Sequence, residues 1–240
     1  MEADPDDAGD GSPARPASPS PGSPVALSDE LWTGVRAIYE AILAHPFLAG
    51  LTSGDLDLRR FRYFVVQDAH YLRAYTRVLE LLAERAPDPA INSMLGRHAA
   101  DANAVERELH AGLLADLPAG PEMDASPTTV AYGNFLVAAV LSGTFAEGLG
   151  AVLPCYVIYW EVGRTLAARS SPEPRYARWI ATYAGADFAR VVSEVVAVAD
   201  RIGLAMSRAE GDRIRSNFVT ASRYEWMFWD AAWRLEAWPV

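Results

Sequence analysis

Apolar residues recur three and four positions apart along nearly the whole chain from residue 27 onward. This spacing places them on one face of an α-helix, and the alternation typical of strands is missing. No segment of about 20 to 50 residues is repeated, so a solenoid or a propeller is not indicated. We therefore predict an all-α fold, an orthogonal bundle of about seven or eight helices.

Capping residues, prolines and glycines set the expected bounds of these helices. Ser28 is placed to cap the first helix, and Ser126-Pro127 begins another because proline suits the first helical turn. Ser142-Gly143 and Pro154 are expected to break the helical course, so that Cys155 begins a new segment. The main expected spans are about 28–45, 58–85, 89–117, 126–142, 174–201 and 207–233.

Residues 1–26 differ in composition from the rest, since Pro, Ser, Gly and Asp dominate and almost nothing is apolar. Such a segment cannot offset its ordering entropy, so we expect a disordered tail there. Residues 27–240 are then expected to form one helical domain, a length at which a single core is usual.

The overall charge narrows the classes of partner. The net charge is -10, which disfavours nucleic acid and anionic membrane surfaces. All 21 basic side chains are arginine, so Schiff-base catalysis by lysine and the lysine-containing phosphate-binding loop are excluded. No transmembrane or secretory segment is indicated. The single cysteine cannot form an internal disulfide, so we expect a cytoplasmic protein.

Two carboxylates fall on faces that helical spacing assigns to the interior. Asp68 shares its face with Phe61, Phe64, Val65, Leu72 and Tyr75; Glu225 shares its face with Ile214, Phe218, Ala221, Phe228, Trp229 and Ala232. An ionised carboxylate buried without partners costs several kcal/mol, so each must be paired, hydrogen-bonded or protonated. A purely structural explanation remains open for both: Asp68 bonded to a tyrosine or arginine, Glu225 in a salt bridge with an arginine. Two inward acids on separate helices favour a shared polar pocket.

Cys155 and a set of tyrosines are the other candidates. Most lone buried cysteines are inert, but a cysteine in the first turn after a proline break would lie at a positive helix end, which stabilises thiolate. The tyrosines near these residues offer flat apolar faces and hydroxyls, which suit a planar polar heteroaromatic ligand, although each alone is more often core. They are Tyr71, Tyr75, Tyr132, Tyr156, Tyr159 and Tyr183.

No metal or cofactor site is indicated. None of the four histidines forms the Glu-x-x-His spacing of helical di-iron proteins. Glu106 and His110 are four residues apart, a spacing more typical of a solvated helix surface.

Three separated segments resemble, in order, the motifs of the TenA/thiaminase II family, and specifically its cysteine-containing class. They are residues 61–72, FRYFVVQDAHYL; residues 141–163, LSGTFAEGLGAVLPCYVIYWEVG; and residues 217–229, NFVTASRYEWMFW. The similarity runs from about Leu31 to Trp238. It implies a haem-oxygenase-like helical fold without haem, and commonly a homotetramer.

The resemblance also implies a reaction. The family hydrolyses 4-amino-5-aminomethyl-2-methylpyrimidine, and thiamine, to 4-amino-5-hydroxymethyl-2-methylpyrimidine for thiamine salvage. Carried over to the matching positions, Cys155 is the nucleophile, Glu225 the acid/base and Asp68 the ligand of the ring nitrogen and amino group. The residues around the ring would be Tyr71, Tyr132, Tyr159, Tyr183 and Phe228.

Two other functions remain open. A cofactorless oxidase of quinone-cofactor synthesis can share this fold, but its acidic quinone would require several inward histidines and arginines. A pyrimidine-binding or regulatory protein would keep the pocket without turnover. Release of ammonia from the aminomethyl pyrimidine would distinguish both from the hydrolase.

Overall fold

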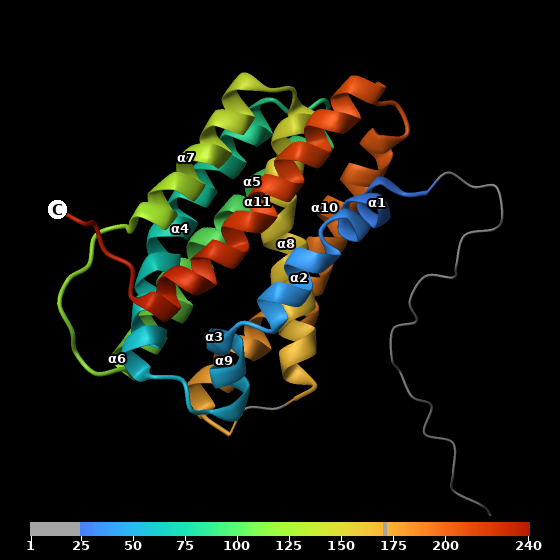
Figure 1. Cartoon of the computed structure of the whole chain (residues 1–240). Coiled ribbons are helices and arrows are strands. Elements are labelled where there is room, and N and C mark those ends of the chain that lie inside the picture. Colours follow the sequence, from blue (N-terminus) through green and yellow to red (C-terminus); the bar gives the residue numbers. More distant parts are fainter. Residues whose placement is uncertain (1–24, 170–171) are drawn as a thin grey trace, which may run out of the picture.

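The computed structural model describes residues 25–169 and 172–240 (Figure 1). Within these ranges the regular structure is entirely helical, which confirms the predicted all-α class. A π-helical segment, η1 (Glu106–His110), lies between α5 and α6. The α-helices are α1 Leu27–Gly34, α2 Arg36–Leu43, α3 Pro46–Ser53, α4 Leu58–Glu84, α5 Pro89–Val105, α6 Ala111–Ala115, α7 Pro127–Ser142, α8 Phe145–Ala167, α9 Pro174–Ala184, α10 Ala186–Gly203 and α11 Arg208–Arg234.

Local sequence signals explain where the long helices begin. The Asp57 side chain caps α4 by accepting from the Arg59 backbone N–H at 2.8 Å. Ser126 caps α7 in the same way, with Pro127 at the first helical position. These starts agree with the predicted spans, as does the predicted end of α7 at Ser142-Gly143.

Several predicted spans are divided in the structure, so the described chain has more helical segments than predicted. The first span breaks at Val35, and the span 174–201 breaks at Gly185, whose backbone is extended. The prediction that Ser28 caps the first helix is wrong. α1 begins at Leu27, and the Ser28 hydroxyl donates instead to Asp200 Oδ2 at 3.0 Å, a contact between helices distant in sequence.

The predicted break at Pro154 is also wrong. Pro154 lies inside α8, and Cys155 is therefore a mid-helix residue far from a positive helix end. Proline removes one backbone hydrogen bond and crowds the preceding turn. Residues 149–154 are all buried, and this packing on every side holds the helix together despite the proline.

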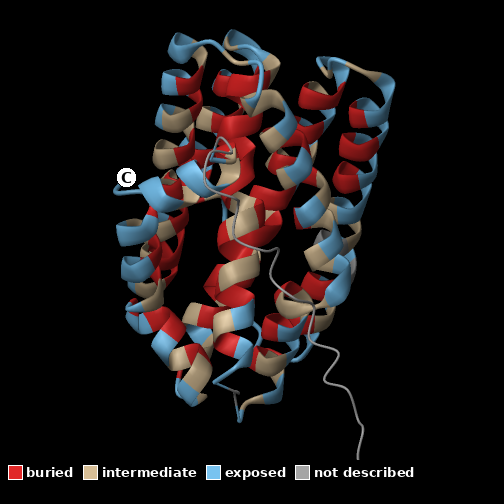
Figure 2. Ribbon diagram, turned by 90° about the vertical axis from the view of Figure 1, so that its right-hand side faces the viewer, coloured by how far each residue is buried: buried red, intermediate tan, exposed pale blue. Residues whose placement is uncertain are grey.

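Helix α8 is the centre of the bundle. It packs against α7, α9, α10 and most extensively against α11, while α4 packs against α5 and α7. The long helices run lengthwise, with the short α3, α6 and α9 at one end (Figure 1). Buried residues face inward along every long helix (Figure 2). In the described chain no helix combines the length and apolar character needed to cross a membrane.

Helices α8 and α9 meet at Gly163. A Cβ placed there would lie 2.7 Å from the carbonyl carbon of Tyr183, which is closer than real contacts allow. Glycine is therefore required by the close approach of the two backbones. The approach, together with the break at Gly185, sets the position of Tyr183.

The predicted tail, residues 1–26, lies outside the described residues apart from its last two, and its disorder stays a prediction.

Candidate active site

A cavity of about 100 Å³ lies inside the bundle, walled by α4, α5, α8, α9 and α10. Since one water takes up roughly 30 Å³ in the liquid, this is room for about three waters. Five of the eight predicted site residues line it: Asp68, Tyr71, Cys155, Tyr159 and Tyr183.

The other three predicted residues stand behind this wall. The Tyr132 ring stacks on Tyr71 with centroids 4.9 Å apart, and Phe228 lies 5.7 Å from Tyr71. The Tyr132 hydroxyl donates to Glu225 Oε1 at 2.6 Å. All eight residues thus form one cluster drawn from α4, α7, α8, α9 and α11, although Glu225, Tyr132 and Phe228 are not themselves part of the cavity wall.

Glu225 is buried, with 1% of its surface exposed. Burial raises the pKa of its carboxyl group to about 8. The hydrogen bond from Tyr132 lowers this pKa, and the charge of the nearby Asp68 raises it further. At neutral pH the group is therefore mostly protonated and able to donate a proton. Among the described residues it has no arginine partner, so the salt bridge considered from the sequence is wrong.

The environment of Cys155 differs from the one predicted. Loss of hydration raises the pKa of the thiol well above its ordinary value, and the Glu225 charge adds to this. The nearby Tyr71 and Tyr75 hydroxyls oppose the rise. The thiol is therefore protonated at rest, and the expected thiolate stabilisation by a helix end is absent. Cys155 is nevertheless partly exposed, because it faces the cavity.

Asp68 has a partner that the sequence did not predict. Nε2 of His110 lies 2.9 Å from Asp68 Oδ2, and both side chains are almost fully buried. Asp68 makes no other hydrogen bond within the described chain, which leaves Oδ1 for a ligand in the cavity. His110 thus fixes the orientation of the carboxylate.

The interpretation of His110 as a solvated surface residue is wrong, since only 2% of it is exposed. His110 ends the π-helical segment η1. A π-turn holds one residue more than an α-turn, so it rotates the later residues by roughly 100° around the helix axis. A projection that assumes an uninterrupted α-helix therefore assigns His110 to the wrong face. The signal in the sequence for burial at this point was the pair of leucines next to it, Leu109 and Leu113, which are both buried.

The tyrosine hydroxyls stay neutral. Burial raises the pKa of Tyr71, Tyr132, Tyr159 and Tyr183 well above the ordinary value. The Tyr71 hydroxyl is buried and no described atom is in hydrogen-bonding geometry with it. A buried hydroxyl without a partner costs free energy, so a polar ligand in the cavity would be stabilised by it.

A histidine of the cavity wall, His98, was not predicted as a site residue. His98 Nδ1 lies 3.2 Å from the Tyr156 hydroxyl and its Nε2 lies 3.3 Å from Glu194 Oε2. His98 is 3% exposed, whereas Glu194 reaches the surface. The three residues come from α5, α8 and α10, so no local motif joins them.

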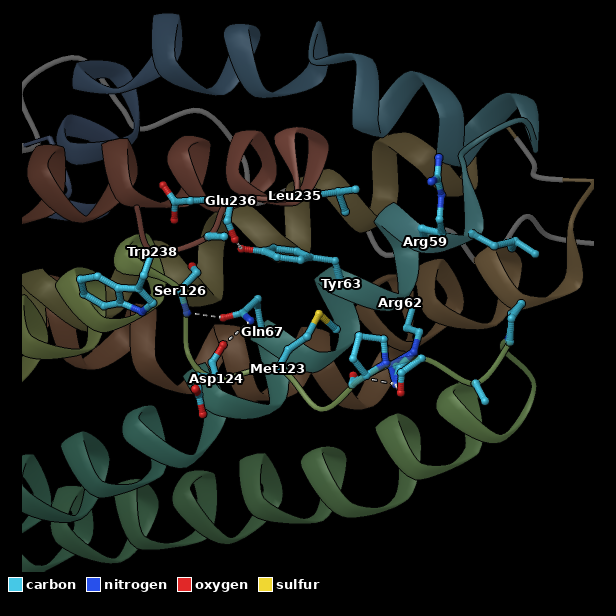
Figure 3. Close-up of a pocket in the computed structure, with 16 residues that line it drawn as sticks. Arg59, Arg62, Tyr63, Gln67, Met123, Asp124, Ser126, Leu235, Glu236 and Trp238 are labelled. Carbon is cyan, nitrogen blue, oxygen red and sulfur yellow. Dashed lines mark hydrogen bonds between the residues drawn. The ribbon is translucent and has the colours of Figure 1, made fainter. Parts of the chain in front are cut away.

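A larger pocket of about 520 Å³ lies elsewhere, between the start of α4, residues 118–126 and the C-terminal residues 235–238 (Figure 3). None of the eight predicted residues lines it. Gln67 does: it donates to the Asp124 carbonyl at 2.9 Å and accepts from the Ser126 N–H at 2.8 Å. In the Gln67-Asp68 pair, the first residue therefore anchors the chain before α7 and the second faces the cavity.

No group of three His, Cys, Asp or Glu side chains arranged to hold a metal ion occurs in the part of the chain that the structure describes. The chemistry available at the cavity wall is that of the Cys155 thiol, the carboxyl groups of Asp68 and Asp101, the His98 imidazole and a set of neutral tyrosines, with Glu225 and His110 directly behind it.

Comparison with known proteins gives the same class. A profile of the TENA/THI-4/PQQC family matches residues 32–235. Aminopyrimidine aminohydrolase of Bacillus subtilis is 34% identical over 216 residues, 88% of this chain and 92% of that protein. The thiamine biosynthesis multifunctional protein ThiED of Corynebacterium efficiens is 36% identical over 228 residues, 92% of this chain and 30% of that protein. The chain belongs to the TENA/THI-4/PQQC family.

Solved structures agree on the fold. A TenA homologue from P. horikoshii superposes with a TM-score of 0.80 at 30% identity, covering 88% of this chain and 99% of that one. A domain of unknown function with a heme oxygenase-like fold from Shewanella denitrificans superposes with a TM-score of 0.69 at 14% identity, covering 87% and 92%. The predicted haem-oxygenase-like helical bundle is confirmed.

Proposed function

We propose that this protein is an aminopyrimidine aminohydrolase of the thiaminase II type. It converts 4-amino-5-aminomethyl-2-methylpyrimidine to the hydroxymethyl form with release of ammonia, and it also cleaves thiamine, in thiamine salvage. The observation that carries the proposal is that Cys155, Asp68 and the buried Glu225 gather around one tyrosine-walled cavity. The sequence identity of 34% with the Bacillus subtilis aminohydrolase and of 36% with ThiED supports a role in the thiamine pathway.

Binding falls to Asp68 and the tyrosines. Asp68 Oδ2 is held by His110, so Oδ1 accepts from the amino-pyrimidine edge of the substrate. Tyr71, Tyr159 and Tyr183 supply apolar faces for the ring. The cavity is smaller than the substituted pyrimidine ring, so the side chains of its wall must move apart to admit the ring. The thiazolium part of thiamine would then lie outside the cavity, toward the exposed Asp101.

The first half of the reaction needs a nucleophile and an acid. The pyrimidine ring by itself does not stabilise charge left by a departing amine. Addition of the Cys155 sulfur to the ring gives a covalent adduct whose electrons expel the amine from the exocyclic carbon. Glu225, mostly protonated near neutral pH, donates the proton that the amine takes with it.

The second half reverses these roles. Glu225, now ionised, accepts a proton from the water that adds to the exocyclic carbon. The carbon–sulfur bond then breaks, the ring becomes aromatic again and the cysteine sulfur leaves. A carboxyl group whose pKa lies near the operating pH serves both halves, which fits the value of about 8.

The oxidase alternative is disfavoured by the cavity wall. An acidic quinone calls for cationic side chains, whereas the wall carries Asp68 and Asp101 and, among the described residues, no arginine. The decisive experiment is incubation of the purified protein with the aminomethyl pyrimidine while ammonia is measured. Ammonia release supports the hydrolase. Tight pyrimidine binding without ammonia would instead favour the regulatory protein.

We further propose a homotetramer in the cytoplasm. α7 carries no charged residue along its length, and its exposed side chains include Val130 and Leu141, which are 36% and 53% exposed. Met227 of α11 adds a further exposed apolar side chain, 40% exposed. A helix without charged residues whose exposed face is mainly apolar is normally covered. A thiol nucleophile also suits a reducing compartment. Sedimentation equilibrium would test the assembly, and a monomer at micromolar concentration would contradict it.

A further inference from the structure

The proposed reaction leaves one proton without an acceptor. Cys155 must lose its thiol proton as it attacks, and its pKa is raised well above the ordinary value. Glu225 is mostly protonated when the cycle begins, so it cannot accept that proton and then act as the acid. Asp68 is held by His110 and assigned to the substrate's amino group, so an acceptor other than these two carboxyl groups is needed.

Glu194, His98 and Tyr156 have the geometry of such an acceptor. A carboxylate only accepts hydrogen bonds, so the contact of 3.3 Å to Glu194 Oε2 requires the His98 proton on Nε2. The His98 Nδ1 lone pair is then directed at the Tyr156 hydroxyl, 3.2 Å away, which donates to it. A carboxylate that orients an imidazole, which in turn accepts from a hydroxyl, is the arrangement found in hydrolytic triads.

Tyr75 connects this group to the nucleophile. Its ring centroid lies 6.0 Å from that of Tyr156, and its hydroxyl donates to the Val152 carbonyl at 3.0 Å, one turn before Cys155. The Tyr75 hydroxyl lies close enough to the Cys155 sulfur and to the Tyr156 hydroxyl to lower the pKa of each as a hydrogen-bonding partner. Burial lowers the pKa of His98, more than Glu194 raises it, so the ring is neutral and free to accept a proton.

We propose that Glu194, His98 and Tyr156 form a proton relay for Cys155, with His98 as the acceptor. The relay deepens the function proposed above and rests on it, because hydrolysis is what requires the thiolate. His98 and Glu194 act through the tyrosines, and they are therefore positioning and relay residues rather than groups that contact the reacting atoms.

Each proton in the relay has a donor and an acceptor. When sulfur bonds to the ring carbon, the S–H bond breaks and its electron pair forms the C–S bond. The Tyr75 hydroxyl turns from the Val152 carbonyl toward Tyr156. The thiol proton then passes to the Tyr75 oxygen, the Tyr75 proton to the Tyr156 oxygen, and the Tyr156 proton to His98 Nδ1. The resulting imidazolium is stabilised by Glu194, and the proton returns by the same path when the sulfur leaves.

Other charged and titratable groups face the relay and enter any pH dependence. Around His98 these are Asp101 and Arg97 of its own helix, besides Glu194 from α10 and Tyr156 from α8. Around Cys155 they are Glu225 from α11, Asp68, Tyr71 and Tyr75 from α4, Tyr132 from α7, Tyr159 from α8 and Tyr183 from α9. The test must therefore vary His98 and Glu194 separately from Glu225.

The test uses the reactivity of the thiol. Cys155 is the only cysteine, so alkylation by iodoacetamide reports this one sulfur. His98→Gln and Tyr156→Phe are each expected to slow alkylation at pH 7 about 10-fold or more, because the base that removes the thiol proton is lost. Glu194→Gln is expected to slow it about 3- to 10-fold, because the imidazolium loses its partner.

Arg97→Gln is the matched control. Arg97 donates to the same Glu194 Oε2 at 3.1 Å, but its positive charge disfavours the imidazolium. Its removal is therefore expected to leave alkylation as fast as in the wild type or faster. A merely structural role of the Glu194 cluster would instead make the Arg97 and Glu194 variants behave alike.

Wild-type alkylation rates at every pH in folded His98→Gln and Glu194→Gln would overturn the relay. If His98→Gln does not fold, the alkylation rate of Glu194→Gln decides whether the relay exists. The Glu194 side chain is 29% exposed, so its replacement should leave the protein folded. Slower alkylation in Glu225→Gln alone would assign the proton to Glu225 and also overturn the relay. The two proposals can also fail separately. If the variants slow alkylation as expected but the wild-type protein releases no ammonia from the aminomethyl pyrimidine, the proposed function is rejected and the relay is not.

Discussion

Replacing Glu225 with glutamine should make the protein more stable while removing its activity. Glutamine keeps the shape and still accepts from the Tyr132 hydroxyl, but it cannot ionise. The folded pKa of Glu225 is about 8 and the reference value is 4.5. Between these values the unfolded chain releases a proton that the folded protein retains, so wild-type stability falls as pH rises.

The size of the effect follows from that difference. Relative to a baseline at pH 4, where both states are protonated, Glu225→Gln should gain about 3 kcal/mol at pH 7 and about 4–5 kcal/mol above pH 8. At pH 7 this corresponds to a rise in Tm of roughly 6–12 °C. Glu225→Gln should also lower kcat about 10²–10⁴-fold, because the amide transfers no proton.

Urea unfolding of both proteins from pH 4 to pH 9 measures the difference. Glu84→Gln, at an exposed glutamate ending α4, is the control and should leave the pH dependence unchanged. Parallel curves for wild type and Glu225→Gln would refute the reasoning, because they would mean that Glu225 ionises normally in the folded protein.

Three further outcomes are expected. Cys155→Ser should lower kcat about 10³-fold or more while pyrimidine binding by calorimetry stays within a few-fold, and near-normal turnover would remove the thiol from the mechanism. Asp68→Asn should weaken pyrimidine binding by about 1–3 kcal/mol, because the amide can turn a donor toward the substrate's amino group; unchanged affinity would argue against that contact. Gly163→Ala should lower the free energy of unfolding in urea by about 1–3 kcal/mol, because the added Cβ meets the Tyr183 backbone. Gly34→Ala is the control and should not lower it, because a Cβ there has no atom within 4 Å. Equal effects of the two substitutions would contradict the close approach at Gly163.

The helical class and the long helices could be predicted because burial imposes a period that the sequence displays directly. The points at which the helices break or continue could not be predicted in the same way. Val35 and Gly185 end helices where the chain turns to reach neighbours, and Pro154 stays inside α8 because packing on all sides outweighs its local preference. Local propensity is a weak guide wherever tertiary contacts decide.

The candidate site shows the same division. Asp68 and Glu225 were visible as charged residues at apolar positions, an anomaly that needs no partner to be recognised. His98 and His110 were not, because their partners lie 96 and 42 residues away in sequence and a π-turn alters the face of His110. The environment of Cys155 was predicted wrongly because it depended on a helix end that does not form.

The rings that wall the cavity are also structural rings of the core. Tyr159 and Tyr183 touch each other and Trp179, and Trp179 meets the buried Trp229 with centroids 5.6 Å apart. A change of specificity made at these rings therefore also alters the packing of the core. A mutation that enlarges the cavity for a bulkier substrate removes packing from the middle of the bundle, and its carriers need compensating substitutions elsewhere to keep the fold. Changes of substrate that go through these rings should therefore be slow and should follow stabilising substitutions.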